Sequence, residues 1–259
     1  MTSLRTEALI LRSIDFGESD RILHLLVPEI GRLPVIAKGA RRSVRRFSGT
    51  LDLFSHVKIQ VDLRRPTSLA RLDQASLIDP FIALRSETAR FALGCYLLEL
   101  FDRLAPERGT HADTRRLFSF ALGALRMVAD RNPDLRLRTL IELRALDALG
   151  LRPEFLRCVR CGSTPVGRGP IGFHVADGGV VCDRCCAQLD GILRVQPGTL
   201  RALDRALRLD LEQLDRLAMS GALLAEARQL LGQFQRFHLG VELRSVPYLD
   251  RVLRSQAPG

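Results

Sequence analysis

The chain has 259 residues, 46% of them hydrophobic, so it can bury a sizeable core and form two domains with a small insert. No apolar run approaches the roughly 20 residues that span a bilayer, and residues 1–7 contain no apolar signal region, so we expect a soluble, cytoplasmic protein in a reducing compartment. The formal net charge of +10 favours a polyanionic partner. All but Lys38 and Lys58 of the 39 basic residues are arginine, a skew that a GC-rich genome also produces, so charge clustering is more informative than total charge.

Residues 3 to about 80 show the pattern of short β-strands separated by turns. Residues 57–63 alternate between apolar and polar side chains, which is typical of a half-buried strand. About five strands in roughly 75 residues predict a small β-barrel, so we assign residues 1–80 to an OB-fold that binds nucleic acid. The predicted strands include 4–14, 21–27, 33–37 and 57–63.

A dense group of cations follows the third of these strands. Between Ile30 and Leu51 there is no acidic residue, and residues 38–46 contain five cations. Their mutual repulsion is unfavourable unless a polyanion lies nearby, so we expect DNA phosphates here, although a solvated loop that only keeps the barrel soluble would have the same composition. Phe47 and Phe54 are candidates either for stacking on a base or for the core. The candidate DNA-binding residues are Lys38, Arg41, Arg42, Arg45 and Arg46, extended by Arg32, Lys58, Arg64 and Arg65.

Helical periodicity replaces the strand pattern near residue 80. Asp79 is a predicted helix N-cap with Pro80 at the first helical position, and this helical region stops before Pro106. Asn132-Pro133-Asp134 is predicted to end the second helix and start a third, which closes at Gly150. We assign residues 81–154 and 192–254 to one α-helical domain. The remaining helices are predicted from about Thr114 and over 197–207, 211–217, 223–240 and 248–253.

Two Cys-x-x-Cys pairs, separated by twenty residues, interrupt the helical pattern. This spacing is typical of a four-cysteine zinc site, because each pair places two thiolates on one ion and the Gly- and Pro-rich interval folds back. A reducing compartment favours metal over a disulfide, and His174 and Cys186 are alternative ligands. We assign residues 155–191 to a nearly neutral insert that structural Zn2+ stabilises, and we do not expect it to read DNA. The predicted ligands are Cys158, Cys161, Cys182 and Cys185.

No catalytic motif accompanies these features. The sequence has no G-x-x-x-x-G-K-[ST] loop, since Lys38 is followed by Gly39 and Lys58 by Ile59, so we expect no nucleotide-hydrolysing motor. It also lacks H-E-x-x-H and G-x-S-x-G, its five histidines are scattered, and no carboxylate cluster indicates a metal-dependent nuclease. We therefore expect a binding protein and not an enzyme.

Three short motifs near the N-terminus give the chain a family resemblance. They are Gly-Glu-Ser-Asp-Arg-Ile-Leu at 17–23, Gly-Arg-Leu at 31–33 and Ala-Lys-Gly-Ala-Arg-Arg at 37–42. Together with the order of barrel, helices and cysteine pairs, they closely resemble the RecO family of bacterial recombination mediators. The resemblance covers essentially the whole chain and implies an OB-fold, a helical domain and a zinc insert. It also implies DNA contacts by Lys38, Arg41 and Arg42, whereas the other cations are added from charge alone.

The resemblance implies a set of activities and partners. Proteins similar to RecO bind single- and double-stranded DNA and anneal complementary strands without ATP. They join RecR to help load RecA onto strands coated by single-stranded DNA-binding protein, whose acidic, apolar C-terminal tail they engage through the helical domain. For this chain, the resemblance implies a nucleoid-associated protein with these partners and no membrane contact.

Two other classes of function fit parts of the sequence. A zinc-containing adaptor would use the basic residues to bind an acidic protein partner, and its DNA binding would be incidental. A zinc-dependent hydrolase would need an open coordination position on the metal, which four thiolate ligands do not leave. Charge reversal at Arg41 and Arg42 separates the adaptor from the DNA-binding protein.

Overall fold

The computed structural model describes residues 3–43, 45–47, 49–63, 69–165, 169–240 and 242–255. Contacts divide the chain into two compact units, which we call the barrel unit (Met1–Pro133 with Leu243–Ser255) and the cysteine unit (Asp134–Glu242). This division places the helices in two groups, whereas the sequence analysis assigned them to one domain. Within the described ranges, none of the helices combines the length and apolar character needed to cross a membrane.

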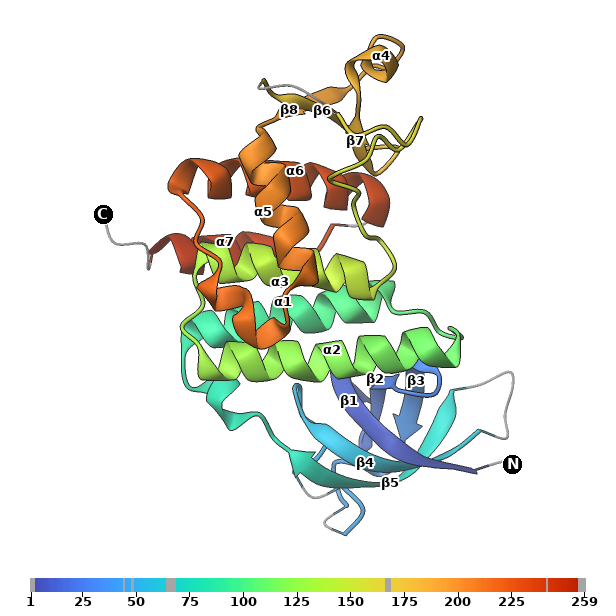
Figure 1. The fold of residues 1–259 in the computed structure, drawn as a ribbon. Helices are drawn as coiled ribbons and strands as arrows, with labels where there is room; N and C mark the ends of the chain where they lie inside the picture. The colour runs from blue at the N-terminus through green and yellow to red at the C-terminus, as the bar shows by residue number, and fades with distance from the viewer. Residues whose placement is uncertain are drawn as a thin grey trace. The chain divides into compact units, whose positions relative to one another are not determined.

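Five strands form a closed barrel in the order β1-β2-β3-β5-β4 (Figure 1). β3 and β5 pair in parallel and the other neighbours are antiparallel. A five-stranded ring with this mixed pairing is OB-like, so the predicted fold of the N-terminal region is confirmed. The strands are β1 (Ser3–Phe16), β2 (Asp20–Val27), β3 (Gly31–Ala37), β4 (His56–Asp62) and β5 (Ala70–Asp79).

Alternate residues of each strand fill the barrel, as the period of two requires. In β1 the register shifts between Ile10 and Arg12, so the inward and outward positions change beyond this point. Ile14 pairs with Ile22 and Phe16 pairs with Asp20, and none of these four side chains belongs to the barrel core. The core residues include Ala8, Ile10, Leu23, Leu25, Val35, Val57, Ile59, Val61 and Leu72.

Both aromatic residues proposed to stack on bases are buried. Phe47 is 4% exposed and belongs to the barrel core, and Phe54 is fully buried with its ring 5.7 Å from that of Phe91 in an edge-to-face arrangement. A buried ring cannot receive a base, so of the two roles considered for these residues the core role is correct.

Asp79 ends β5 and does not cap a helix, so this prediction was wrong. Its Oδ1 accepts a hydrogen bond from the backbone N of Phe81 at 2.8 Å, and Phe81 adopts a left-handed conformation with φ of 46°. Such a turn and a helix N-cap use the same side-chain oxygen, which explains the error. The helical elements of the barrel unit are η1 (Ile82–Arg85), α1 (Thr88–Leu104), α2 (His111–Asp130) and α7 (Val246–Ser255).

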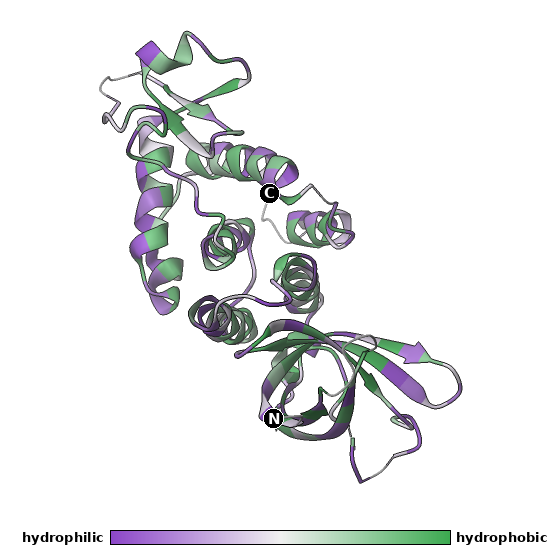
Figure 2. Cartoon of the chain, turned by 90° about the vertical axis from the view of Figure 1, so that its right-hand side faces the viewer, coloured by the Kyte–Doolittle hydropathy of each residue, from purple (hydrophilic) through white to green (hydrophobic). Residues whose placement is uncertain are grey.

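The cysteine unit packs three helices together and adds a small sheet. The first helix starts after Asn132-Pro133-Asp134, as predicted, and Asp134 caps it by accepting from the backbone N of Leu137 at 2.6 Å. Gly240 ends the last helix in a left-handed conformation. Green and purple alternate along the helices in Figure 2, as expected for helices with one apolar face. The elements are α3 (Leu135–Ala148), β6 (Ile171–His174), β7 (Gly179–Val181), α4 (Asp183–Cys186), β8 (Ile192–Val195), α5 (Pro197–Arg208), η2 (Leu211–Arg216) and α6 (Gly221–Leu239).

Candidate nucleic-acid interface and metal centre

The cations that follow β3 lie on a loop fastened to the barrel; we call residues 38–46 the basic loop. Phe47 comes directly after it and lies in the barrel core, and Leu51 further along is also buried there. The backbone N of Ala75 on β5 donates to the carbonyl of Arg46 at 3.0 Å. These contacts fix the backbone at the C-terminal end of the loop, from which its charged side chains project.

The start of the basic loop is attached to the turn between β1 and β2. Asp20 accepts a hydrogen bond from the backbone N of Gly39 at 2.8 Å, and its other carboxylate oxygen lies 3.1 Å from Lys38 Nζ. The Gly39 hydrogen bond and the neighbouring Lys38 lower the pKa of Asp20. The backbone N of Arg41 donates to the carbonyl of Ser19 at 2.9 Å. The loop and the hairpin therefore form one surface.

Carboxylates from the hairpin balance part of the loop's charge, which the sequence analysis missed. Arg41 lies 3.9 Å from Asp15, and Arg42 lies 3.6 Å from Glu18. The repulsion expected within the loop is thus relieved without a polyanion. The signal was present in Asp15-Phe16-Gly17-Glu18, which had been used only as a turn marker.

These ion pairs are open to exchange. The side chains of Lys38, Arg41 and Arg42 are 59%, 46% and 73% exposed, and exposed ion pairs contribute little free energy. Arg45 is exposed and makes no ion pair with any other described residue, while Arg46 donates to the carbonyl of Lys38 at 2.7 Å. Phosphate oxygens can therefore replace the hairpin carboxylates as partners of these cations.

Arg32 does not belong to this surface, in contrast to its predicted place among the DNA contacts. Its guanidinium donates to the carbonyl of Asp102 at 3.0 Å, lies 3.4 Å from the carboxylate of Asp102, and pairs with Glu107. His24 Nδ1 lies 2.5 Å from the same Asp102 carboxylate. Burial by itself would raise the pKa of Asp102, but His24 and Arg32 lower it overall. The arrangement joins the barrel to α1.

Lys58 lies near the end of the basic loop but far from its start. On β5 its partner is Ser76, and the backbone N of the neighbouring Ala75 donates to the carbonyl of Arg46 at 3.0 Å, whereas on β1 its partner is Glu7, eight positions before Asp15. A DNA contact by Lys58 therefore stays a prediction. Arg64 and Arg65 lie outside the described residues.

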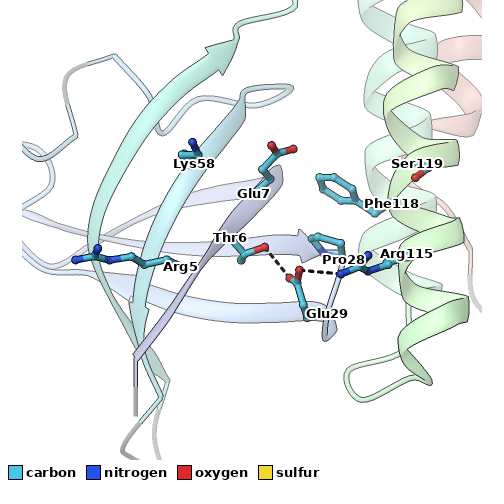
Figure 3. Close-up of a pocket in the computed structure, with 9 residues that line it drawn as sticks. All are labelled: Arg5, Thr6, Glu7, Pro28, Glu29, Lys58, Arg115, Phe118 and Ser119. Carbon is cyan, nitrogen blue, oxygen red and sulfur yellow. Dashed lines mark hydrogen bonds and ion pairs between the residues drawn. The ribbon is translucent and has the colours of Figure 1, made fainter. Parts of the chain in front are cut away.

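Lys58 lines a separate pocket of about 650 Å³ between the barrel and α2 (Figure 3). Glu29 at this pocket accepts from Thr6 Oγ1 at 2.6 Å and lies 3.9 Å from Arg115. The pocket mixes cations with carboxylates, so its charge does not favour a polyanion. Its lining is Arg5, Thr6, Glu7, Pro28, Glu29, Lys58, Arg115, Phe118 and Ser119.

The four predicted cysteine ligands come together in the cysteine unit. Their sulfur atoms all lie within 4.8 Å of one another, and Sγ of Cys161 and Cys182 are 3.7 Å apart. A tetrahedral zinc ion with Zn–S bonds of about 2.3 Å separates its ligand sulfurs by about 3.8 Å. The donor set and its spacing therefore fit a tetrahedral metal ion. The cluster consists of Cys158, Cys161, Cys182 and Cys185.

Backbone hydrogen bonds shape each cysteine pair into a tight turn. The backbone N of Gly162 donates to the carbonyl of Cys158 at 2.8 Å, and that of Cys185 donates to the carbonyl of Cys182 at 3.0 Å. Gly162 has a φ of 74°, which favours glycine. These turns direct both sulfur atoms of each pair toward the centre of the four-cysteine cluster.

The alternative ligands lie outside the cluster. Sγ of Cys186 is 3.8 Å from the carbonyl of Val181, and a side chain at Gly172 would collide with it. His174 Nδ1 lies 2.8 Å from the carboxylate of Asp177. Neither residue belongs to the group of four sulfurs.

The electrostatics of the cluster favour a bound cation. Hydrogen bonding with Ser163 lowers the pKa of Cys161 to about 6, whereas its contact with Cys182 raises the pKa of Cys185 to about 12. Four thiolates this close repel one another, so they ionise together only with a cation between them. Arg184 also lies beside the sulfurs, and its hydrogen bond to Cys161 raises the pKa of the guanidinium.

Aromatic side chains fasten the insert to α6. The ring of Phe173 on β6 is fully buried, 6.1 Å from that of Phe155 and 6.5 Å from that of Phe234. His238 Nε2 lies 2.7 Å from the carbonyl of Val175. The insert that carries the cysteine cluster is thus packed against α6 through buried aromatic side chains.

Comparison with known proteins covers both units. The family model "Recombination protein O N terminal" matches residues 1–81, and "Recombination protein O C terminal" matches residues 85–247. The chain is 36% identical to the DNA repair protein RecO of Anaeromyxobacter dehalogenans (strain 2CP-C) over 252 residues, which cover 97% of this chain and 98% of that protein. It is 35% identical over 256 residues to the DNA repair protein RecO of Symbiobacterium thermophilum, with 98% and 99% covered.

We predict that Arg32→Gln lowers the free energy of unfolding by about 1 to 3 kcal/mol, because it removes a partner of the buried Asp102 carboxylate. Because the pKa of Asp102 is lowered in the folded state, the ionised carboxylate stabilises the fold above its unfolded pKa, and this stabilisation is lost as the pH falls through the folded pKa. The difference in unfolding free energy between wild type and Arg32→Gln should therefore narrow below about pH 4. Urea unfolding at several pH values measures this. Arg41→Gln is the control, with an unchanged midpoint expected; equal midpoints for wild type and Arg32→Gln would contradict the assignment.

We predict that the purified chain carries one tightly bound metal ion, which the double substitution Cys158→Ser, Cys161→Ser removes while lowering the melting temperature. Metal analysis and thermal unfolding give the two readouts. Cys186→Ser is the matched control and retains the metal, because its sulfur lies outside the cluster. Full metal content in the double variant, or unchanged thermal stability, would refute the role of the cluster.

Proposed function

The chain belongs to the RecO family of DNA repair and recombination proteins, and on that premise we propose that it binds single- and double-stranded DNA and anneals complementary strands without ATP. Acting with RecR, it helps load RecA onto single-stranded DNA. The observation that supports this best is the basic loop, whose exposed cations are attached to the β1–β2 turn of an OB-like barrel. Loops at this end of an OB-fold commonly bind oligonucleotides.

Annealing needs no reactive side chain in this proposal. Two complementary strands repel each other through their phosphates, and cations that contact both strands lower this repulsion. Base pairing then supplies the free energy. The candidate contacts are Lys38, Arg41, Arg42, Arg45 and Arg46, all on the basic loop. These cations only lower the repulsion between the strands, and base pairing supplies the free energy. Annealing in this proposal therefore requires no nucleotide hydrolysis.

We propose that Zn2+ occupies the cysteine cluster with a structural role. Four thiolates complete a tetrahedral shell and leave no position for a substrate, which argues against a zinc-dependent hydrolase. The small sheet β7-β6-β8 has few residues to bury, so a metal that joins its two turns contributes directly to its stability. The fit of the sulfur spacing to a zinc site supports this assignment.

The proposed protein partners are RecR and the acidic, apolar C-terminal tail of single-stranded DNA-binding protein, with RecA reached indirectly. Family membership supports RecR, and the net charge of +10 suits acidic partners. The adaptor alternative uses the same basic loop for such a partner. It differs by predicting that DNA affinity survives when the loop charge is reversed.

We predict that the wild-type chain anneals complementary oligonucleotides without nucleotide and that Arg41→Glu, Arg42→Glu abolishes both annealing and DNA binding. The reason is that reversed charges repel phosphates at the point where the loop joins the hairpin. A fluorescence-transfer assay with labelled strands measures annealing, and circular dichroism verifies that the variant is folded.

The matched control is Arg251→Glu, Arg254→Glu, which makes the same change of charge on exposed positions of α7 and should anneal normally. If the loop variant annealed like wild type, the DNA path would lie elsewhere. If it kept DNA affinity but lost RecR or tail binding, the adaptor would be correct.

A further inference from the structure

One aromatic side chain of the barrel is exposed to solvent. Phe16, Phe47, Phe54 and Phe81 are the only Phe, Tyr or Trp residues in positions 1–81. Three of them are buried with at most 4% exposure, whereas Phe16 is 51% exposed. An exposed phenylalanine loses the free energy that burial would provide, and a partner that covers it would recover part of that energy.

Phe16 lies on the same side of the hairpin as the anchor of the basic loop. It is the last residue of β1 and pairs directly with Asp20, and paired residues on antiparallel strands project to the same face. Asp20 in turn holds Lys38 and the backbone N of Gly39. The ring and the first cation of the loop therefore share one face.

An apolar row continues this face along the barrel. Ile14 pairs with Ile22 on β2, and Ile22 pairs with Ile36 on β3, so the three side chains lie side by side on the outside of the barrel. Ile14 is 36% exposed and the other two are half-buried. On the other side of Phe16, Arg42 lies 3.6 Å from Glu18 in the turn. The surface thus combines an apolar strip with cations at its edge.

We propose that Phe16 stacks on a base of single-stranded DNA while the basic loop holds the adjoining phosphates. This inference rests on the proposed function and names the group that contacts bases. A nucleotide has a flat apolar base and a charged phosphate, which match the ring and the cations respectively. Because bases in a duplex are already stacked and paired, the contact favours single strands and holds unpaired bases open for a complementary strand.

A protein partner is the competing occupant of this surface. Nucleic acid is favoured because three exposed cations of the basic loop pair with Asp15, Glu18 and Asp20, which flank Phe16 in the hairpin, so these carboxylates are already neutralised. A purely apolar partner would leave those cations without a role. The test below separates a base from a protein contact by using DNA alone.

The chain contains no tryptophan, so a single introduced tryptophan is a specific fluorescent probe of its position. We expect Phe16→Trp to retain DNA binding and its fluorescence to be quenched by an oligo-dT strand, since stacking on a base quenches indole emission. An abasic strand of equal length has the same phosphates without bases and should leave the emission nearly unchanged. Phe237→Trp is the matched control, because Phe237 is 58% exposed on α6 in the cysteine unit, and DNA should not quench it.

Affinity gives the second readout. Phe16→Ala should bind oligo-dT about 5- to 100-fold more weakly, the loss typical of one stacked base, while its affinity for the abasic strand and for duplex stays unchanged. Unaltered affinity of Phe16→Ala for oligo-dT together with unquenched Phe16→Trp would overturn the stacking role alone. If wild type bound no DNA, the proposed function would fail, and the stacking role with it.

Discussion

The hydrogen bond and ion pair of Asp20 determine where the positive charge of the barrel lies. One carboxylate fixes the backbone of Gly39 and the side chain of Lys38 to the β1–β2 hairpin. Without this contact, the first two residues of the acid-free basic loop would lose their attachment to the hairpin, while its end would remain anchored through Arg46 and Phe47. With it, the loop becomes an extension of the barrel surface, and its cations lie beside the outer face of β1. A short polar contact thus organises the surface that we assign to DNA.

The two units carry different candidate sites, a cationic loop and a cysteine cluster. The barrel supplies exposed cations whose present partners are surface carboxylates, and such pairs exchange readily with phosphates. The cysteine cluster supplies a closed donor set with no open position for chemistry. The barrel unit contains the residues matched by the N-terminal RecO family model, and the cysteine cluster lies within those matched by the C-terminal one.

The sequence predicted features that depend on local pattern or short spacing. The barrel strands follow from period-two alternation, the start of α3 from the Asn-Pro-Asp boundary at 132–134, and the cysteine cluster from the two paired spacings. Arg32 was assigned to DNA because it falls in the acid-free segment between Ile30 and Leu51, yet its contact with Asp102 joins residues 70 positions apart. The choice between core and stacking for Phe47 was left open for the same reason, since the side of the barrel on which a residue lies depends on strand register and tertiary packing. The hairpin carboxylates Asp15 and Glu18 are present in the sequence, but their position beside the loop follows only from the fold.

The salt dependence of DNA affinity tests the central claim most directly. Five phosphate contacts predict a slope of log affinity against log salt of roughly −3 to −4 for single strands. Removing two cations in Arg41→Gln, Arg42→Gln should reduce the magnitude of this slope by about 1.4, because each contact contributes about 0.7. A folded variant with the wild-type slope and affinity would show that the phosphates bind elsewhere, and the basic loop would lose its assigned role.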